Sequence, residues 1–194
     1  MISKKVSNIV CWLIKNGAID KDEYELYEYA IYSLLLLWTP MIIAIVFGII
    51  MNEILKGVIM IIPFMLIRKY SGGYHAKSIR VCLTISSILM CTFFIILKNI
   101  QVSIAFNVIT CFSALIIAIF SPVDSENRRL EDTEVKRFSK ISIIITFFVL
   151  LVYWLIQLTT WRDYSVCFGL SLILTAILMI PCIDKKARKM SFRS

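Results

Sequence analysis

The sequence has little charge for its length, and this shortage excludes several classes of protein. Only 18% of its 194 residues are charged, against about a quarter in soluble domains. Hydrophobic residues make up 59% of the chain. A soluble domain of this size has too little interior to bury so much apolar surface. The composition therefore argues against a soluble enzyme, a disordered protein or a nucleic-acid-binding domain, and it indicates an integral membrane protein.

Signatures of metal sites and disulfides are also missing. The single histidine cannot supply a multi-histidine metal site, and none of the six cysteines belongs to a Cys-x-x-Cys pair. Most of the cysteines lie in apolar runs, where the default role is that of a small buried side chain. We expect no metal and no cofactor. We also expect no cleavable signal peptide, because the apolar run Ile9 to Ile14 is too short for one.

What is present is a series of apolar segments. They cover approximately residues 30–50, 54–67, 81–97, 102–120, 141–158 and 166–183. A membrane-spanning helix needs about 17–25 apolar residues, and five of the segments meet that range. The segment 54–67 is shorter and contains Gly57 and Pro63. It either crosses a thinned bilayer or is re-entrant or broken.

The distribution of basic residues predicts how these segments are oriented. The net charge is +8, and the basic residues gather in blocks between apolar segments. From the N-terminus onward the connections carry 4, 1, 4, 1, 5, 1 and 5 basic residues. Cytoplasmic loops of membrane proteins are enriched in Lys and Arg. The alternation predicts a multi-pass protein of the cell membrane with six crossings and both termini in the cytosol.

The fold class expected from these patterns is an all-α, polytopic membrane helical bundle with about six membrane segments. Residues 1–28 form a separate, interfacial segment, and residues 29–194 form a single membrane-embedded domain. Within the first segment, Val6, Ile9 and Val10 recur at helical spacing beside lysines. That spacing predicts a short amphipathic helix at the membrane surface. A plain anchor is favoured over a substrate-docking helix.

One stretch, Arg68 to Cys82, departs from the alternation of span and loop. It holds the only histidine, His75, two of the six glycines and four basic residues. The adjacent Gly72 and Gly73 favour a tight bend. By itself such a pair is a weak signal, because ordinary loops contain it as well.

Within this stretch, Cys82 has the surroundings of a reactive thiol. Ser78 is a candidate N-cap for a helix that continues through Cys82. A helix N-terminus and nearby cations both favour the thiolate form. On one continuous helix, His75 and Cys82 would lie about 10.5 Å apart along the axis, too far for the hydrogen bond that activates a thiol. The pair therefore requires His75 on a loop folded back over the helix start.

Each of these residues also has a plainer interpretation. A lone histidine near a membrane interface often only hydrogen-bonds there, and a cysteine in an apolar run is usually part of the core. Asn107 lies in a span, where a helix-packing role is favoured over a catalytic one. We assign no role to Arg128 and Arg129, and no third catalytic residue is apparent.

The pattern Arg-x-x-x-Gly-Gly-x-His-Ala from Arg68 to Ala76, followed by Cys82, resembles the AgrB family of accessory gene regulator membrane endopeptidases. The polar stretch Ser121 to Leu130 adds to the likeness. The resemblance implies a cysteine endopeptidase in which His75 and Cys82 are the catalytic pair. Arg68, Gly72 and Gly73 are supporting positions by the same match.

The resemblance further implies the reaction and the partners. The substrate is an AgrD-like quorum-sensing propeptide, cut on the C-terminal side of the future signal and held as a thioester. An internal Cys or Ser then closes a thiolactone or lactone ring. The resemblance also implies that the enzyme is a homodimer. The count of basic residues places the active site at the cytosolic face, and the apolar composition predicts membrane lipid, and not nucleic acid, as a partner. Two alternatives remain: a small membrane transporter or permease component, and a structural or sensor membrane protein whose basic loop binds lipid headgroups.

Overall fold

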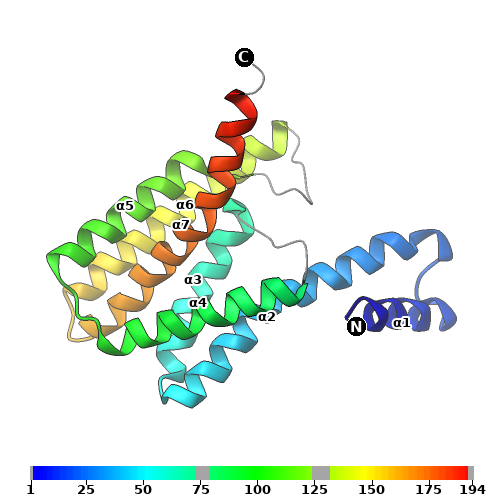
Figure 1. Ribbon diagram of the computed structural model, residues 1–194, viewed down its shortest axis with the longest axis horizontal. Helices are drawn as coiled ribbons and strands as arrows, with labels where there is room; N and C mark the ends of the chain where they lie inside the picture. The colour runs from blue at the N-terminus through cyan, green and yellow to red at the C-terminus, as the bar shows by residue number, and fades with distance from the viewer. Residues whose placement is uncertain (1, 73–78, 124–131, 192–194) are drawn as a thin grey trace. The chain divides into compact units, whose positions relative to one another are not determined.

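The computed structural model describes residues 2–72, 79–123 and 132–191, and helices joined by short connections make up this part of the chain (Figure 1). Seven α-helices and one short 3-10 helix (Lys21–Glu23) occur in it, without a β-strand. The α-helices are α1 (Ile2–Lys15), α2 (Tyr24–Met51), α3 (Ile54–Ser71), α4 (Ile79–Asn99), α5 (Ile104–Phe120), α6 (Asp132–Gln157) and α7 (Arg162–Ser191). The all-α fold expected from the sequence is confirmed.

The chain divides into two compact units, residues 1–42 and 43–194, with the boundary inside α2. In the first unit, α1 is the predicted amphipathic helix. Its residues Val6 and Val10 are fully buried, whereas Ile9 is exposed. Next to Val6, the Ser7 hydroxyl lies 2.7 Å from the Tyr24 hydroxyl at the start of α2. Part of the apolar surface of α1 is thus covered within the protein, and only part of it faces outward.

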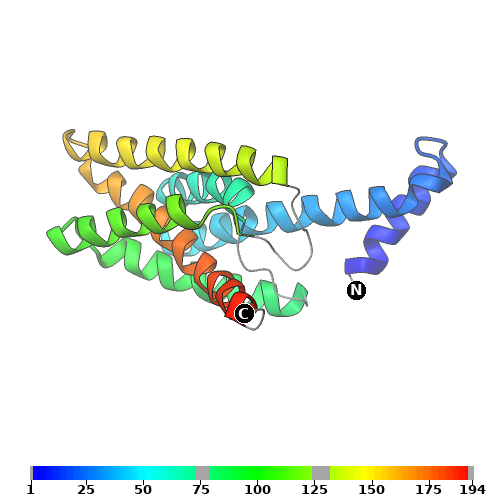
Figure 2. The ribbon, with the colours of Figure 1, turned by 90° about the horizontal axis from the view of Figure 1, so that it is seen from above.

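In the second unit, α7 is the central helix. It packs against α3, α5 and α6 and touches α4 (Figures 1 and 2). In the most apolar stretch of α7, 61% of the residues are buried, against 22% in the corresponding stretch of α6. The difference places α7 inside the bundle and α6 on its surface.

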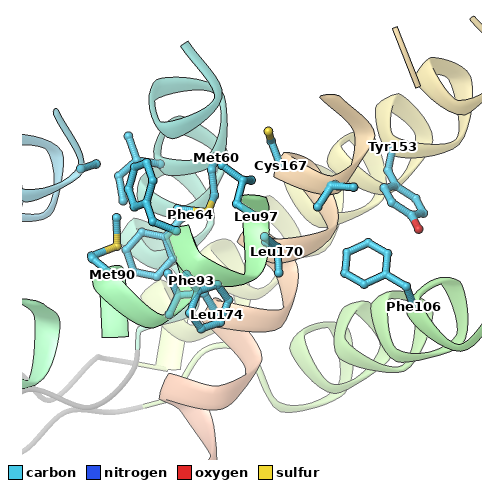
Figure 3. Packing of buried hydrophobic residues seen from close by; sticks show 14 residues of the cluster. Met60, Phe64, Met90, Phe93, Leu97, Phe106, Tyr153, Cys167, Leu170 and Leu174 are labelled. Carbon is cyan, nitrogen blue, oxygen red and sulfur yellow. The ribbon is translucent and has the colours of Figure 1, made fainter. Parts of the chain in front are cut away.

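A cluster of large side chains holds α3, α4 and α7 together (Figure 3). Its members include Met60 and Phe64 of α3 and Phe93 of α4. Gly57 of α3 allows α3 and α4 to approach each other, because a Cβ there would lie only 2.5 Å from Cζ of Phe94 in α4. The helix α3 also continues without a break through Pro63. Gly57 therefore serves close packing rather than an interruption of the helix.

Two helices of the described chain are long and apolar enough to cross a membrane. They are Thr133–Gln157 in α6 and Arg162–Cys182 in α7, each with a mean hydropathy of 2.2 over its most apolar part. Shorter apolar stretches are Val6–Lys15, Trp38–Met51, Thr84–Asn99 and Ile104–Phe120. Large apolar side chains are exposed along α5 and α6, for example Phe112 and Phe147. Such an outward apolar surface is what a lipid-facing helix presents, because lipid tails do not penalise it.

The helix α6 extends on its N-terminal side beyond the apolar segment 141–158. It starts at Asp132, so the basic residues Lys136, Arg137 and Lys140 lie in its first turns rather than in a loop. Its inward face carries small hydroxyl residues, Ser142 and Thr146, both buried. Small residues at this spacing let neighbouring membrane helices pack closely.

Candidate functional site

Arg68 lies in the last turn of α3, which ends at Ser71. Its guanidinium carbon lies over the ring of Phe64, 5.7 Å from the ring centroid, and one of its guanidinium nitrogens is buried. A guanidinium over an aromatic face at this distance is a stabilising cation–π arrangement. Arg68 is therefore anchored one turn before the glycine pair rather than extended into water.

Gly72 ends α3 in a conformation that side-chain-bearing residues avoid. Its φ is +73°, and its N–H donates a hydrogen bond to the carbonyl of Arg68 over 3.1 Å. A Cβ at this position would lie 2.2 Å from the carbonyl oxygen of Val123. Both the backbone angle and the close approach require glycine. The first glycine of the pair is thus a helix cap pressed against another segment.

That segment is the chain that follows α5, and a short backbone pairing joins it to α3. The N–H of Val123 donates to the carbonyl of Ser71 over 2.9 Å, and Gly72 and Val123 form an isolated parallel β-bridge. Ser71 and Val123 are both buried. We call this pairing of residues 71–72 with Val123 the backbone bridge. It fixes the point at which the chain leaves α3.

A second contact ties the end of α3 to the start of α6. The rings of Tyr70 and Phe138 meet edge to face, with their centroids 5.8 Å apart. Aromatic pairs favour this geometry. Together with the backbone bridge, this contact brings the C-terminal ends of α3 and α5 and the first turns of α6 to one end of the bundle.

The structure describes some of the predicted site residues and not others. Arg68 and Gly72 are described above. Gly73, His75 and Ser78 lie outside the described residues. Cys82 lies in the first turn of α4 as the structure describes it, in agreement with the helix start expected from the sequence. The contact between His75 and Cys82 stays a prediction.

An open cleft of about 440 Å³ lies beside the backbone bridge. Its walls come from the end of α5, the Ser121–Pro122 segment and the first turns of α6. They consist of Ile119, Phe120, Ser121, Pro122, Val135, Lys136, Ser139 and Lys140. The cleft thus combines apolar side chains with hydroxyls and two amines. Nowhere in residues 2–72, 79–123 and 132–191 do three or more metal-ligating side chains of the His, Cys, Asp or Glu type come together.

Sequence reasoning did not identify the backbone bridge, the Tyr70–Phe138 contact or the cleft. The one available signal is the Ser-Pro pair directly after the apolar segment 102–120, which enters the sequence argument only through the family resemblance. Contacts between positions fifty residues or more apart leave no mark on local periodicity.

Asn107 has the packing role that was favoured from the sequence. It lies near the start of α5, and its side-chain oxygen accepts hydrogen bonds from the Tyr153 hydroxyl and from Nε2 of Gln157, the latter over 3.3 Å. These contacts join α5 to α6 at the opposite end of α5 from Ser121. Asn107 therefore has no part in the candidate site.

Comparison with known proteins identifies the family of this chain. The chain matches the family described as AgrB, Accessory gene regulator B, over residues 6–180. It is 27% identical over 159 residues to the "Putative AgrB-like protein" of Clostridium perfringens strain SM101 and 28% identical over 159 residues to the "Putative AgrB-like protein 2" of strain 13. Each alignment covers 77% of this chain and 71% of the relative. No solved structure matches the chain significantly. Since the family match extends over most of the sequence, the chain belongs to the AgrB family and has its role in the accessory gene regulator system.

Proposed function

We propose that this chain is a membrane cysteine endopeptidase that cleaves an AgrD-like propeptide at its C-terminal side. Through a thioester acyl-enzyme it then promotes closure of a thiolactone or lactone ring. The observation that carries the proposal is the family match, which includes the whole Arg68–Cys82 stretch. The position of Cys82 in the first turn of α4 supports it, because that is where a helix stabilises a thiolate.

Two side chains, His75 and Cys82, carry out the proposed reaction. His75 takes the proton from Cys82, and the thiolate attacks the scissile carbonyl to form a C–S bond. The peptide C–N bond breaks, and His75 returns the proton to the leaving amine. The N-terminal part of the peptide remains on Cys82 as a thioester. An internal thiol or hydroxyl of the peptide attacks that thioester, His75 accepts its proton, and the proton returns to the departing sulfur.

The backbone bridge supports the pairing of His75 with Cys82. Because Gly72 ends α3, the helix does not carry His75 away in a continuous line. His75 is only four residues before Ile79, so at most about 14 Å of extended chain separates their Cα atoms. A fixed departure from α3 and a short return to α4 restrict where the imidazole can lie. We propose that this restriction holds it beside the sulfur.

The same contacts support an active site on the cytosolic face. Lys69 lies in the last turn of α3, and Lys136 and Arg137 lie in the first turns of α6. The Tyr70–Phe138 contact and the backbone bridge bring these two basic regions to one end of the bundle. By the positive-inside rule, that end faces the cytosol. Homodimer formation and contact with an acidic propeptide segment belong to the same proposal.

The transporter alternative depended on a broken helix at residues 54–67. The helix α3 is continuous there, and Gly57 packs against Phe94. No observation on the described chain favours a transport pathway, and we do not propose one.

The test uses two substitutions of the proposed catalytic pair. Cys82→Ala and His75→Ala should each abolish propeptide cleavage in membranes, while the amount of inserted protein stays unchanged. The measurement is the ratio of cleaved to uncleaved propeptide by mass spectrometry. Cys91→Ala is the matched control, because Cys91 lies nine residues further along α4, about 13.5 Å deeper. It should cleave normally. Cleavage by either catalytic variant would overturn the proposal.

A further inference from the structure

The cleft beside the backbone bridge has a polar side that the proposed chemistry does not use. Lys136 and Lys140 are four residues apart on α6, so their side chains lie on the same face of the helix. Both are exposed, and neither forms an ion pair within the described ranges of the chain. Two exposed amines at one opening make the cleft attractive to an anion.

An independent feature of the cleft wall also indicates a ligand. The Ser121 side chain is 93% buried (7% exposed), and its hydroxyl has no hydrogen-bond partner among the described residues. Leaving a buried hydroxyl unpaired is unfavourable, because the group has lost its hydrogen bonds to water without replacing them. Ser121 lines the cleft, together with Ser139 from the facing turn of α6. These hydroxyls can donate to an anionic oxygen that enters between them.

The remaining walls are apolar, and they continue into the outer surface of the bundle. Ile119 and Phe120 line the cleft and are themselves exposed. Further exposed apolar side chains follow along α5 and α6, among them Leu115 and Ile144. A ligand that fits this arrangement has an anionic group for the lysines and an apolar part for the helix surfaces. Inorganic phosphate has no apolar part to contact these walls. A strongly acidic peptide segment likewise offers them little apolar surface.

We infer that this cleft binds the headgroup phosphate of an anionic phospholipid from the inner leaflet. The phosphate lies between Lys136, Lys140 and the Ser121 hydroxyl, and the acyl chains run along the exposed faces of α5 and α6. Basic pockets between membrane helices on the cytoplasmic side bind anionic headgroups in this way. The binding does not depend on the proposed peptidase activity.

Native mass spectrometry of the protein in detergent tests the inference directly. Titration with phosphatidylglycerol should load one lipid at lower concentration than titration with phosphatidylcholine. The double variant Lys136→Gln/Lys140→Gln should weaken phosphatidylglycerol binding about fivefold for each lysine removed and leave phosphatidylcholine binding unchanged. Lys98→Gln is the matched control, because Lys98 is an exposed lysine near the end of α4, and it should bind like the wild type.

A second variant keeps the test informative if the double variant folds poorly. Ser121→Ala removes only the buried hydroxyl and should weaken phosphatidylglycerol binding about fivefold. Equal loading of the two lipids, or wild-type affinity in both Ser121→Ala and the double variant, would overturn the inference. Two competitors identify the source of the anion. Displacement of the lipid by millimolar inorganic phosphate, or by an equimolar glutamate-rich peptide, would show that the cleft prefers that ligand and is not a lipid site.

Discussion

At Gly72, both the backbone conformation and the contact with Val123 require a glycine. Its φ of +73° is strained for any side chain, and the Val123 carbonyl occupies the space a Cβ would need. Backbone atoms cannot yield as the end of a flexible side chain can. The sequence shows only that a glycine is present, and the contact explains why no other residue fits.

We expect Gly72→Ala to abolish or severely reduce propeptide cleavage. A side chain at φ +73° and ψ −153° costs about 1–3 kcal/mol, and the clash with Val123 forces the backbone bridge apart in addition. Cleavage in membranes and thermal unfolding in detergent measure the two effects. The control is Gly17→Ala, because Gly17 has a similar φ of +67° but nothing within 4 Å of the place that a Cβ would take. This variant should lose only the stability that the backbone strain costs, and it should retain cleavage activity. Equal behaviour of the two variants would show that the contact with Val123 does not matter.

At the scale of elements, polar contacts and close packing join the helices. Asn107 links α5 to α6, and Gly57 lets α3 approach α4. Inside a membrane, apolar burial does not drive one helix onto another, because lipid tails are equally apolar. Small residues and hydrogen bonds must therefore provide the specificity.

The Asn107 contacts give a prediction about stability. Asn107→Leu removes the acceptor shared by Tyr153 and Gln157 and should destabilise the bundle by about 0.6–1.7 kcal/mol. Reversible unfolding in detergent measures the change. Asn99→Leu is the matched control, because Asn99 is exposed and its side chain only donates to the carbonyl of Ile95 in its own helix. Cleavage should persist in both variants, since Asn107 is at the other end of α5 from the bridge. Loss of cleavage with unchanged stability would assign Asn107 to the chemistry instead.

At the scale of the whole molecule, the contacts between helix ends decide which connections lie on the same side of the membrane. The backbone bridge joins the end of α3 to the chain after α5, and Tyr70 meets Phe138 of α6. Two basic regions that are far apart in the sequence are thereby held together. Charge counting predicts the same arrangement by an independent argument.

Labelling of single cysteines tests this topology. In a chain whose six native cysteines are replaced by serine, Lys69→Cys and Lys136→Cys should be protected from a membrane-impermeant maleimide in intact cells and labelled in inverted vesicles. Lys98→Cys and Arg162→Cys should show the opposite pattern, because their connections carry a single basic residue each. Labelling of positions 69 and 136 from different sides would contradict the fold. Labelling of both from outside would reverse the orientation and leave the fold intact.

Much of the fold was predictable because its causes are local. Long apolar runs bounded by charged blocks specify membrane helices, and helical spacing specified α1. The apolar segment 141–158 marks where α6 becomes apolar, whereas the helix itself begins at Asp132, because hydropathy does not report where a helix begins. The broken helix considered for residues 54–67 did not occur, because Gly57 and Pro63 are accommodated by packing within a continuous α3.

The sequence by itself determined that the chain is an α-helical membrane protein, where its basic loops lie and which stretch carries a cysteine and the lone histidine. Those properties follow from composition and from the order of residues along the chain. Only the tertiary structure decided that Val123 closes on Gly72, that Tyr70 meets Phe138 and that a basic cleft opens beside Ser121. The first two contacts join residues separated by fifty or more positions, and the cleft depends on how the end of α5 packs beside the first turns of α6. The energies of all three depend on which surfaces meet. No local pattern encodes that choice.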